Sequence, residues 1–431
     1  MGARIAKHDW NGEILPEDKT TIGFKILEYL QHHHRKTARE IADALRADNA
    51  SVHRWVGQKA GKNSPGKGLR SVLEATGSPQ RYSLRSDTGT VLSVDLGAQH
   101  WRVACTGVGP HDYRGLKPRG ETVAFESPQQ AIELAGRAAK ALLADVAPEE
   151  IAAVVIGVPF TPDDQDRPRR GGEWNGPWLP RDLYRRLGWK AHTTPPHIVE
   201  SNTSLGAVAE HAALCDAGRY KPELRQGRLT ITYVKWSTTL RAAVVIDGRL
   251  RRNDGLAASF VHEAVDESDS DFANIAECHV CRRPCAASRA GLQYLTPRIR
   301  KVLVEHSLPE DLAVVGAESI APRLVALAKE HEAVGDIVRA AAFAVGHCLG
   351  HSANVIAGQN VVVGGAFKDD DADWIKDHIE TGYRAATTPA IFEDVRLITG
   401  NHTGSAAVAG GLILGAERYA VPYLWWKSQY G

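Results

Sequence analysis

Short apolar runs that end at glycine turns constrain the fold of this chain more than any other feature. They lie at residues 90–97 (TVLSVDLG), 151–159 (IAAVVIGVP) and 360–365 (NVVVGG). Such runs, bounded by turn residues, are typical of strands buried on both faces. Small-residue helices are predicted over 341–356 and 404–416. Buried strands combined with helices predict an α/β fold.

Composition sets the outer limits. At 431 residues the chain has room for about three domains. Its 43% hydrophobic and 24% charged residues are ordinary for a soluble protein, and no apolar run approaches the ~18 residues of a membrane span. The N-terminal residues lack the apolar core of a signal peptide. We therefore expect a cytoplasmic protein with no membrane association.

The first ninety residues predict three helices and a β-hairpin. Thr37 and Glu40 have the spacing of a capping box, which opens the second helix. Asp48 or Asn49 can cap the third. Two strands, 69–74 and 81–84, are joined by a Gly-Ser-Pro turn.

Positive charge is concentrated in the same region, although the formal net charge of the whole chain is only +1. Between residues 46 and 85 eight Lys and Arg face two acids. A local excess of this kind is typical of a surface that binds a polyanion.

Half of the six cysteines lie within eight residues, as Cys278-x-x-Cys281-x-x-x-Cys285. In a cytosolic chain this clustering favours a metal site over disulfides. His262 and His279 are the nearby candidates for a fourth ligand.

The segment 200–210 (ESNTSLGAVAE) resembles the ENDANAAALGE motif of the ROK family, named for repressors, open reading frames and kinases. Four further features fit the family: the Asp95-Leu-Gly97 turn, the Gly-x-Pro turn at 157–159, His262 and the cysteine cluster. The resemblance covers nearly the whole chain.

The resemblance implies a fold and partners. The fold is α/β: a winged helix-turn-helix (1–86), then a two-lobed actin-like ATPase body of the ROK sugar-kinase type. Residues 89–200 form its first lobe, and 201–431 form a second lobe with a zinc site and a dimer interface. The third helix would place Ser51, His53 and Arg54 near base edges, with Lys59, Lys62 and Arg81 near phosphates. The expected partner is a double-stranded, palindromic DNA operator bound by a homodimer or homotetramer.

The resemblance also implies a structural zinc ion as cofactor. Its ligands would be one imidazole and three thiolates, which close a tetrahedral site. They are His262, Cys278, Cys281 and Cys285.

The positions that carry kinase chemistry have changed. Asn202 stands where family kinases have the aspartate that acts as general base, and a carboxamide cannot accept that proton. Ser201 and Ser259 replace an Asn and a Glu that bind sugar hydroxyls. Thr239 and Arg241 stand at positions that are glycines in the second phosphate loop, where backbone amides approach phosphate.

These changes predict a regulator that is not an enzyme. Its cleft would bind a sugar, a sugar phosphate or another small-molecule effector through Ser201, Asn202, Ser259 and His262. One alternative is an active or residual ATP-dependent sugar kinase that also binds DNA. The other is a ligand-independent regulator with a vestigial cleft.

Overall fold

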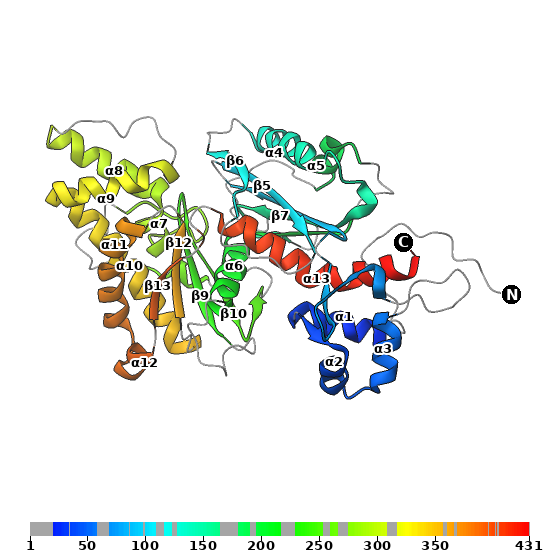
Figure 1. The fold of residues 1–431 in the computed structure, drawn as a ribbon. Coiled ribbons are helices and arrows are strands. Elements are labelled where there is room, and N and C mark those ends of the chain that lie inside the picture. The colour runs from blue at the N-terminus through cyan, green and yellow to red at the C-terminus, as the bar shows by residue number, and fades with distance from the viewer. Residues whose placement is uncertain are drawn as a thin grey trace.

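The computed structural model consists of two lobes and a smaller N-terminal domain (Figure 1). It describes residues 20–33, 35–57, 69–85, 87–97, 100–108, 116–122, 127–163, 180–189, 195–216, 229–252, 259–265, 275–307, 317–356, 360–365, 369–394, 396–400, 402 and 405–430. Each lobe is built on a five-stranded sheet, and a three-stranded sheet lies in the N-terminal domain. The α/β class expected from the apolar runs is confirmed.

The first lobe contains the sheet β6-β5-β4-β7-β8. β4 is antiparallel to β5, whereas β4, β7 and β8 run parallel. All residues of β7 are buried, as its unbroken apolar run predicts. The bounds are β4 Thr90–Leu96, β5 His100–Gly107, β6 Arg119–Thr122, β7 Ile151–Val158, β8 His197–Ser201, α4 Pro128–Leu142 and α5 Pro180–Leu187.

The second lobe contains the sheet β11-β10-β9-β12-β13. Alternate residues of β9 enter different cores: Tyr233 packs with α6, and Val234 packs with a helical layer that includes α10. The sheet is thus covered on both faces. Its strands are β9 Ile231–Trp236, β10 Leu240–Ile246, β11 Arg249–Arg251, β12 Asn360–Gly365 and β13 Arg396–Thr399. The helices are α6 Asn202–Asp216, η7 Ser259–His262, α7 Ala286–Ala290, α8 Leu292–Glu305, α9 Ala317–Glu330, α10 Glu332–Ile356, α11 Asp369–Ala386 and α12 Pro389–Asp394.

Helix α10 starts nine residues before the predicted 341 and ends at the predicted Ile356. Among the described helices it alone has the length and apolar composition that could cross a membrane, with a window of mean hydropathy 1.3. However, 56% of that window is buried within the fold. Packing in the core therefore accounts for its apolar composition.

The N-terminal domain has three helices and the sheet β1-β3-β2. The predicted strand at 69–74 is wrong in its first half, because Leu69–Ser71 form a 3₁₀ turn and the strand runs from Leu73 to Thr76. Leu69 and Val72 are both fully buried, and a 3₁₀ turn puts residues three apart on one side. The remaining bounds are α1 Ile22–His32, β1 Lys36–Thr37, α2 Ala38–Leu45, α3 Asn49–Gly57 and β3 Arg81–Leu84.

The C-terminal segment is a single helix, α13 Ala406–Tyr430, which starts two residues after the predicted 404 and continues well beyond the predicted 416. It continues through Pro422, although proline cannot donate a backbone hydrogen bond to the preceding turn. Burial of Tyr423, Leu424 and Trp425 fixes the turn beyond the proline. α13 packs on β4, β7 and α6, and its far end packs on α1 (Figure 1).

Candidate ligand cleft, metal centre and DNA-binding surface

A pocket lies where the two lobes meet, and it encloses about 360 Å³ of space open to solvent. Strands of both sheets and the first turn of α13 contribute to its wall. Two of the lining side chains are cationic, Arg102 and Lys235. The lining residues are Asp95, Arg102, Asn202, Tyr233, Lys235, Gly365, His402, Ala406 and Ala407.

Asp95, at the end of β4, is buried and paired with His100, the first residue of β5. Nε2 of His100 lies 2.9 Å from Oδ2 of Asp95, and Oδ1 has no hydrogen-bond partner among the described residues. Burial alone would raise the pKa of the Asp95 carboxyl. The charge and hydrogen bond of His100, with help from Lys235 and Arg102, outweigh burial and lower that pKa below its ordinary value. We therefore assign an ionised carboxylate, held by the His100 ring, at this position.

The His100 ring also occupies the space directly above Gly97. A Cβ atom at Gly97 would lie 2.1 Å from Cε1 and 2.3 Å from Nδ1 of that ring. Only glycine fits under the ring at this distance. The backbone at the Asp95-Leu-Gly97 turn is therefore covered by a side chain of the same hairpin.

One of the four residues predicted to bind an effector lies in the wall of this pocket. Asn202 lines the pocket, but Ser201, Ser259 and His262 are not among the residues that line it. The Ser201 hydroxyl accepts a hydrogen bond from the Ser204 amide at 3.1 Å and therefore stabilises the first turn of α6. Glu200, just before, has its Oε2 atom 2.6 Å from Nε of Arg252.

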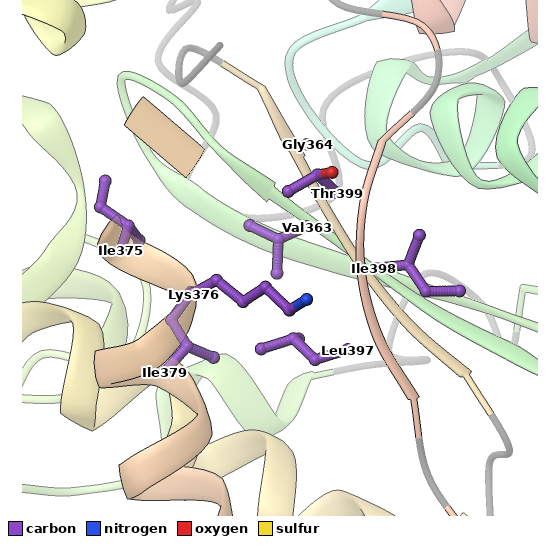
Figure 2. Close-up of a pocket in the computed structure, with 8 residues that line it drawn as sticks. All are labelled: Val363, Gly364, Ile375, Lys376, Ile379, Leu397, Ile398 and Thr399. Carbon is purple, nitrogen blue, oxygen red and sulfur yellow. The ribbon is translucent and has the colours of Figure 1, made fainter. Parts of the chain in front are cut away.

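A second, more apolar pocket lies between β12, β13 and α11 (Figure 2). It spans about 330 Å³, a volume that includes open solvent. Lys376 extends its aliphatic chain across it, between Val363 and Leu397. The other lining residues are Gly364, Ile375, Ile379, Ile398 and Thr399.

Of the two residues assigned to the second phosphate loop, Thr239 lies in a turn and Arg241 lies within strand β10. Residues 237–239 form a tight turn, and β10 begins at Leu240. The carbonyls of Ser237 and Thr238 accept hydrogen bonds from Leu292 and Gln293 at the start of α8. This turn therefore uses its backbone carbonyls to satisfy a helix N-terminus.

The structure brings the four predicted zinc ligands together in one cluster, His262, Cys278, Cys281 and Cys285. Their ligand atoms all lie within 4.8 Å of one another, with Nδ1 of His262 3.5 Å from Sγ of Cys278 and 3.7 Å from Sγ of Cys285. One imidazole and three sulfur ligands at this spacing fit a closed tetrahedral zinc site. His279, the competing candidate, instead lies against Tyr294, with the two rings tilted and their centroids 5.6 Å apart.

The thiols of this cluster shift one another's pKa. Hydrogen bonds from Cys285 and then from His262 lower the pKa of the Cys278 thiol well below its ordinary value. The same contact with Cys278 raises the pKa of Cys285. One thiolate is thus already favoured, and a bound zinc ion would supply the charge that allows the others to ionise.

Helix α3 carries the predicted base-contacting residues. Of the two candidate N-cap residues, it is Asp48 that caps this helix, because the Oδ2 atom of Asp48 accepts a hydrogen bond from the Ser51 amide at 2.9 Å. Val52 and Val56 are buried, whereas His53 and Arg54 are exposed and Ser51 is half-buried. Lys59 and Lys62 lie outside the described residues.

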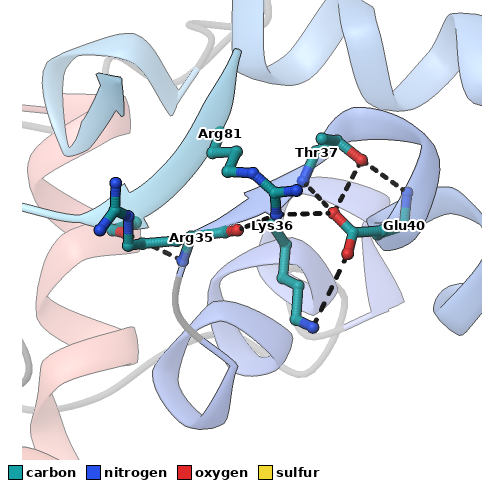
Figure 3. A network of polar contacts seen from close by, with 6 residues as sticks. Arg35, Lys36, Thr37, Glu40 and Arg81 are labelled. Atoms are coloured by element: carbon teal, nitrogen blue, oxygen red, sulfur yellow. Dashed lines mark hydrogen bonds and ion pairs between the residues drawn. The ribbon is translucent and has the colours of Figure 1, made fainter. Parts of the chain in front are cut away.

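Arg81, the first residue of β3, connects this strand to helix α2 (Figure 3). Its Nη1 donates to the Arg35 carbonyl at 2.9 Å and lies 3.4 Å from Oε2 of Glu40. Glu40 and Thr37 also form the predicted capping box. Hydrogen bonds from the backbone and the side chain of Thr37 lower the pKa of the Glu40 carboxyl. Arg81 therefore makes structural contacts within the N-terminal domain that the sequence analysis did not predict. Its contact with a DNA phosphate stays a prediction.

Sequence reasoning missed three polar residues that line the cleft, Arg102, Lys235 and His402, and also His100, the partner of Asp95. The one usable signal was the pairing of β4 with β5, because this antiparallel pair returns His100 to Asp95 and places Arg102 directly opposite it. Lys235 and His402 come from segments that are distant in the sequence.

Solved structures with the same fold are consistent with this description. A ROK family transcriptional regulator, described as a homologue of the E. coli MLC protein, matches 95% of this chain and 98% of its own, with TM-score 0.67 and 15% identity. A ROK family glucokinase from Streptomyces griseus, solved with glucose and AMPPNP, matches 76% of this chain and 99% of its own (TM-score 0.55, 19% identity). A ROK hexokinase from Thermus thermophilus matches 75% of this chain and 97% of its own (TM-score 0.52, 20% identity).

No protein-family model and no curated protein matches the sequence. The structural matches define the class: the chain has the ROK fold, and the resemblance to that family is confirmed at the level of the fold. The kinases match about three quarters of the chain, whereas the regulator matches nearly all of it. The regulator match therefore includes most of the N-terminal domain.

Proposed function

We propose that this protein is a DNA-binding transcriptional regulator whose two-lobed body binds a small-molecule effector and transfers no phosphate. The observation that carries the proposal is that helix α13 runs from the cleft to the N-terminal domain. Its first residues, Ala406 and Ala407, line the cleft between the lobes, and Trp425 near its end is buried against the N-terminal domain. A 25-residue helix spans about 37 Å, so one rigid element joins the two sites.

Specific contacts hold this helix near the cleft and at its middle. Just before the helix, the backbone amide of His402 donates to Oε1 of Glu210 in helix α6 at 2.8 Å. In the middle of α13, the carbonyls of Ala416 and Glu417 accept hydrogen bonds from Nε2 of Gln31, in α1, at 3.0 and 3.1 Å. A ligand that changes lobe closure would therefore move the N-terminal domain.

Two features argue against phosphoryl transfer. Asn202 lines the cleft where a kinase needs a base, and the loss of a general base typically costs ~10²–10⁴-fold in rate. The His100 ring covers Gly97 in the Asp95-Leu-Gly97 turn, where the family resemblance implies that phosphate would approach the backbone. Phosphate oxygens would have to displace this ring and its contact with Asp95 before they could reach the backbone.

DNA binding is supported by the exposed face of α3 and by its local charge. His53 and Arg54 project away from the core formed by Val52 and Val56. In a winged helix-turn-helix the corresponding helix enters the major groove, where an arginine can bind guanine through two hydrogen bonds. Two copies of the chain would read the two halves of a palindrome.

The direct test of the DNA-binding part selects duplexes from a random pool with the full chain and measures affinity by gel shift. Arg54→Ala should weaken binding to the selected duplex by about 1–3 kcal/mol and relax its sequence preference. Lys25→Ala, which removes an exposed charge from α1, is the matched control and should leave the preference unchanged. Failure of the wild-type chain to select any sequence would contradict the proposal.

The non-catalytic part is tested separately by ADP release with glucose, N-acetylglucosamine and xylose. We expect no turnover above the protein-free rate. Measurable turnover would favour the alternative of an active kinase. If a ligand is found by thermal shift, it and the operator must change each other's affinity by the same factor; independent binding would favour a vestigial cleft.

A further inference from the structure

A second cluster of metal-ligating side chains lies beside the cysteine centre but shares no residue with it. It consists of Glu263, which follows η7, and of His347 and His351 on helix α10. We propose that these three residues bind a first-row divalent transition ion such as Ni²⁺, Co²⁺ or Zn²⁺ through two imidazoles and one carboxylate.

The spacing of the histidines on the helix supports the proposal. Residues four apart lie on one face of an α-helix, so both rings point to the same side of α10. Their ring centroids are 4.5 Å apart. Nδ1 of His351 is hydrogen-bonded to Oε1 of Glu263, and Nδ1 of His347 lies 3.9 Å from that same oxygen.

The three ligand atoms all lie within 4.8 Å of one another. Metal–ligand distances of about 2.0–2.2 Å place neighbouring ligands roughly 3 Å apart. A rotation of the His347 ring that moves its nitrogen by about 1 Å would therefore complete the site. A simple hydrogen bond between Glu263 and His351 needs no second histidine, whereas a chelate does.

The surroundings hold all three groups in place. α10 lies so close to α11 that a Cβ atom on Gly346 would be 1.9 Å from the Ile379 carbonyl oxygen, which fixes the rotation of α10. Phe343 stacks on His347 with ring centroids 5.9 Å apart. The backbone of Glu263 makes two hydrogen bonds. Its amide donates to the Phe260 carbonyl at 2.9 Å, and its carbonyl accepts from the Ala286 amide at 3.0 Å.

The donor set and its exposure define the class of ion. Imidazole and carboxylate ligands suit Zn²⁺, Ni²⁺ and Co²⁺, whereas the neighbouring cysteine centre offers sulfur ligands that favour zinc. The side chains are partly exposed, 28% for Glu263, 39% for His347 and 49% for His351. Water can therefore fill the remaining coordination positions, and the ion can exchange with solvent.

The experiment titrates Ni²⁺ into the full chain after its zinc content has been measured. The titration is followed by calorimetry and by native mass spectrometry. His32, His33 and His34 are first changed to Gln, because three successive histidines also bind nickel. We expect one Ni²⁺ per chain in addition to zinc.

His347→Gln and His351→Gln should each weaken this binding by more than the 10- to 100-fold that loss of an outer-shell partner typically costs. His306→Gln, an exposed histidine at the end of α8, is the matched control and should bind Ni²⁺ like the parent. Unchanged zinc content in every variant shows that the cysteine centre is intact. The proposal is overturned if the double variant His347→Gln/His351→Gln binds as much Ni²⁺ as the parent, or if His306→Gln binds as little as the double variant.

Discussion

A matched pair of glycine substitutions tests how the N-terminal domain is attached to α13. A Cβ atom at Gly23, in α1, would lie 2.7 Å from two ring atoms of Trp55 and 2.8 Å from a ring atom of Trp425. Gly57, the last residue of α3, has no atom within 4 Å of its would-be Cβ. Gly23→Ala therefore adds a methyl group between two indole rings, and Gly57→Ala adds one to open space.

The magnitude follows from packing. Carbon atoms in contact normally lie about 3.5–4.0 Å apart, so the rings must move by roughly 1 Å. Trp425 is only 2% exposed and also packs edge-on against Phe24 at 6.0 Å, so its ring has little room to move. Overpacking of this kind costs about 1–3 kcal/mol.

Both substitutions also gain helix propensity, up to about 1 kcal/mol in a helix interior and less at a helix end. This gain is similar in the two variants and largely cancels when they are compared. We therefore expect the N-terminal domain of Gly23→Ala to be less stable than that of Gly57→Ala by about 1–3 kcal/mol.

Amide hydrogen exchange of peptides from α1 and α3 measures this difference directly, because it reports local opening of the domain. A gap of this size corresponds to exchange that is roughly 5- to 150-fold faster in Gly23→Ala, since 1.4 kcal/mol is tenfold. Peptides from β9 and β12 in the second lobe should be unaffected. Equal protection of α1 in the two variants would refute the packing described between α1 and α13.

Three further predictions concern the cleft and the metal centre. His100→Gln removes the partner of a buried carboxylate and should lower the free energy of unfolding by about 3–5 kcal/mol, measured by urea denaturation. The folded-state pKa of Asp95 is depressed, so its stabilising contribution is present above the unfolded pKa of about 3.9 and is lost as the pH falls through the folded value. The urea midpoint of the wild type should therefore fall as the pH is lowered below about 4. The part of this fall that comes from Asp95 should be absent in Asp95→Asn. The same pH dependence in both proteins would show that ionisation of Asp95 does not contribute to stability. Zinc content measured by elemental analysis should be lost in Cys285→Ser and retained in His279→Gln. Loss of zinc in His279→Gln would assign the fourth ligand to His279.

Much of the local structure followed from the sequence because it depends on neighbours along the chain. The capping box at Thr37 and Glu40 involves residues three apart, and the buried strand at 151–158 is one unbroken apolar run. The cysteine centre was visible for the same reason, since Cys278, Cys281 and Cys285 lie within one short segment. Within one element, residue spacing alone fixes which side chains share a face.

The sequence by itself therefore determined the α/β class, the helical N-terminal domain and the chemistry of the metal ligands. The tertiary structure alone decided where the C-terminal aromatic residues dock, which side chain covers Gly97, and that Glu263 meets a histidine 88 residues away. The link from Gln31 to Ala416 spans 385 residues. Periodicity carries no information about the relative placement of such distant elements, because that placement is set by how their buried faces pack together.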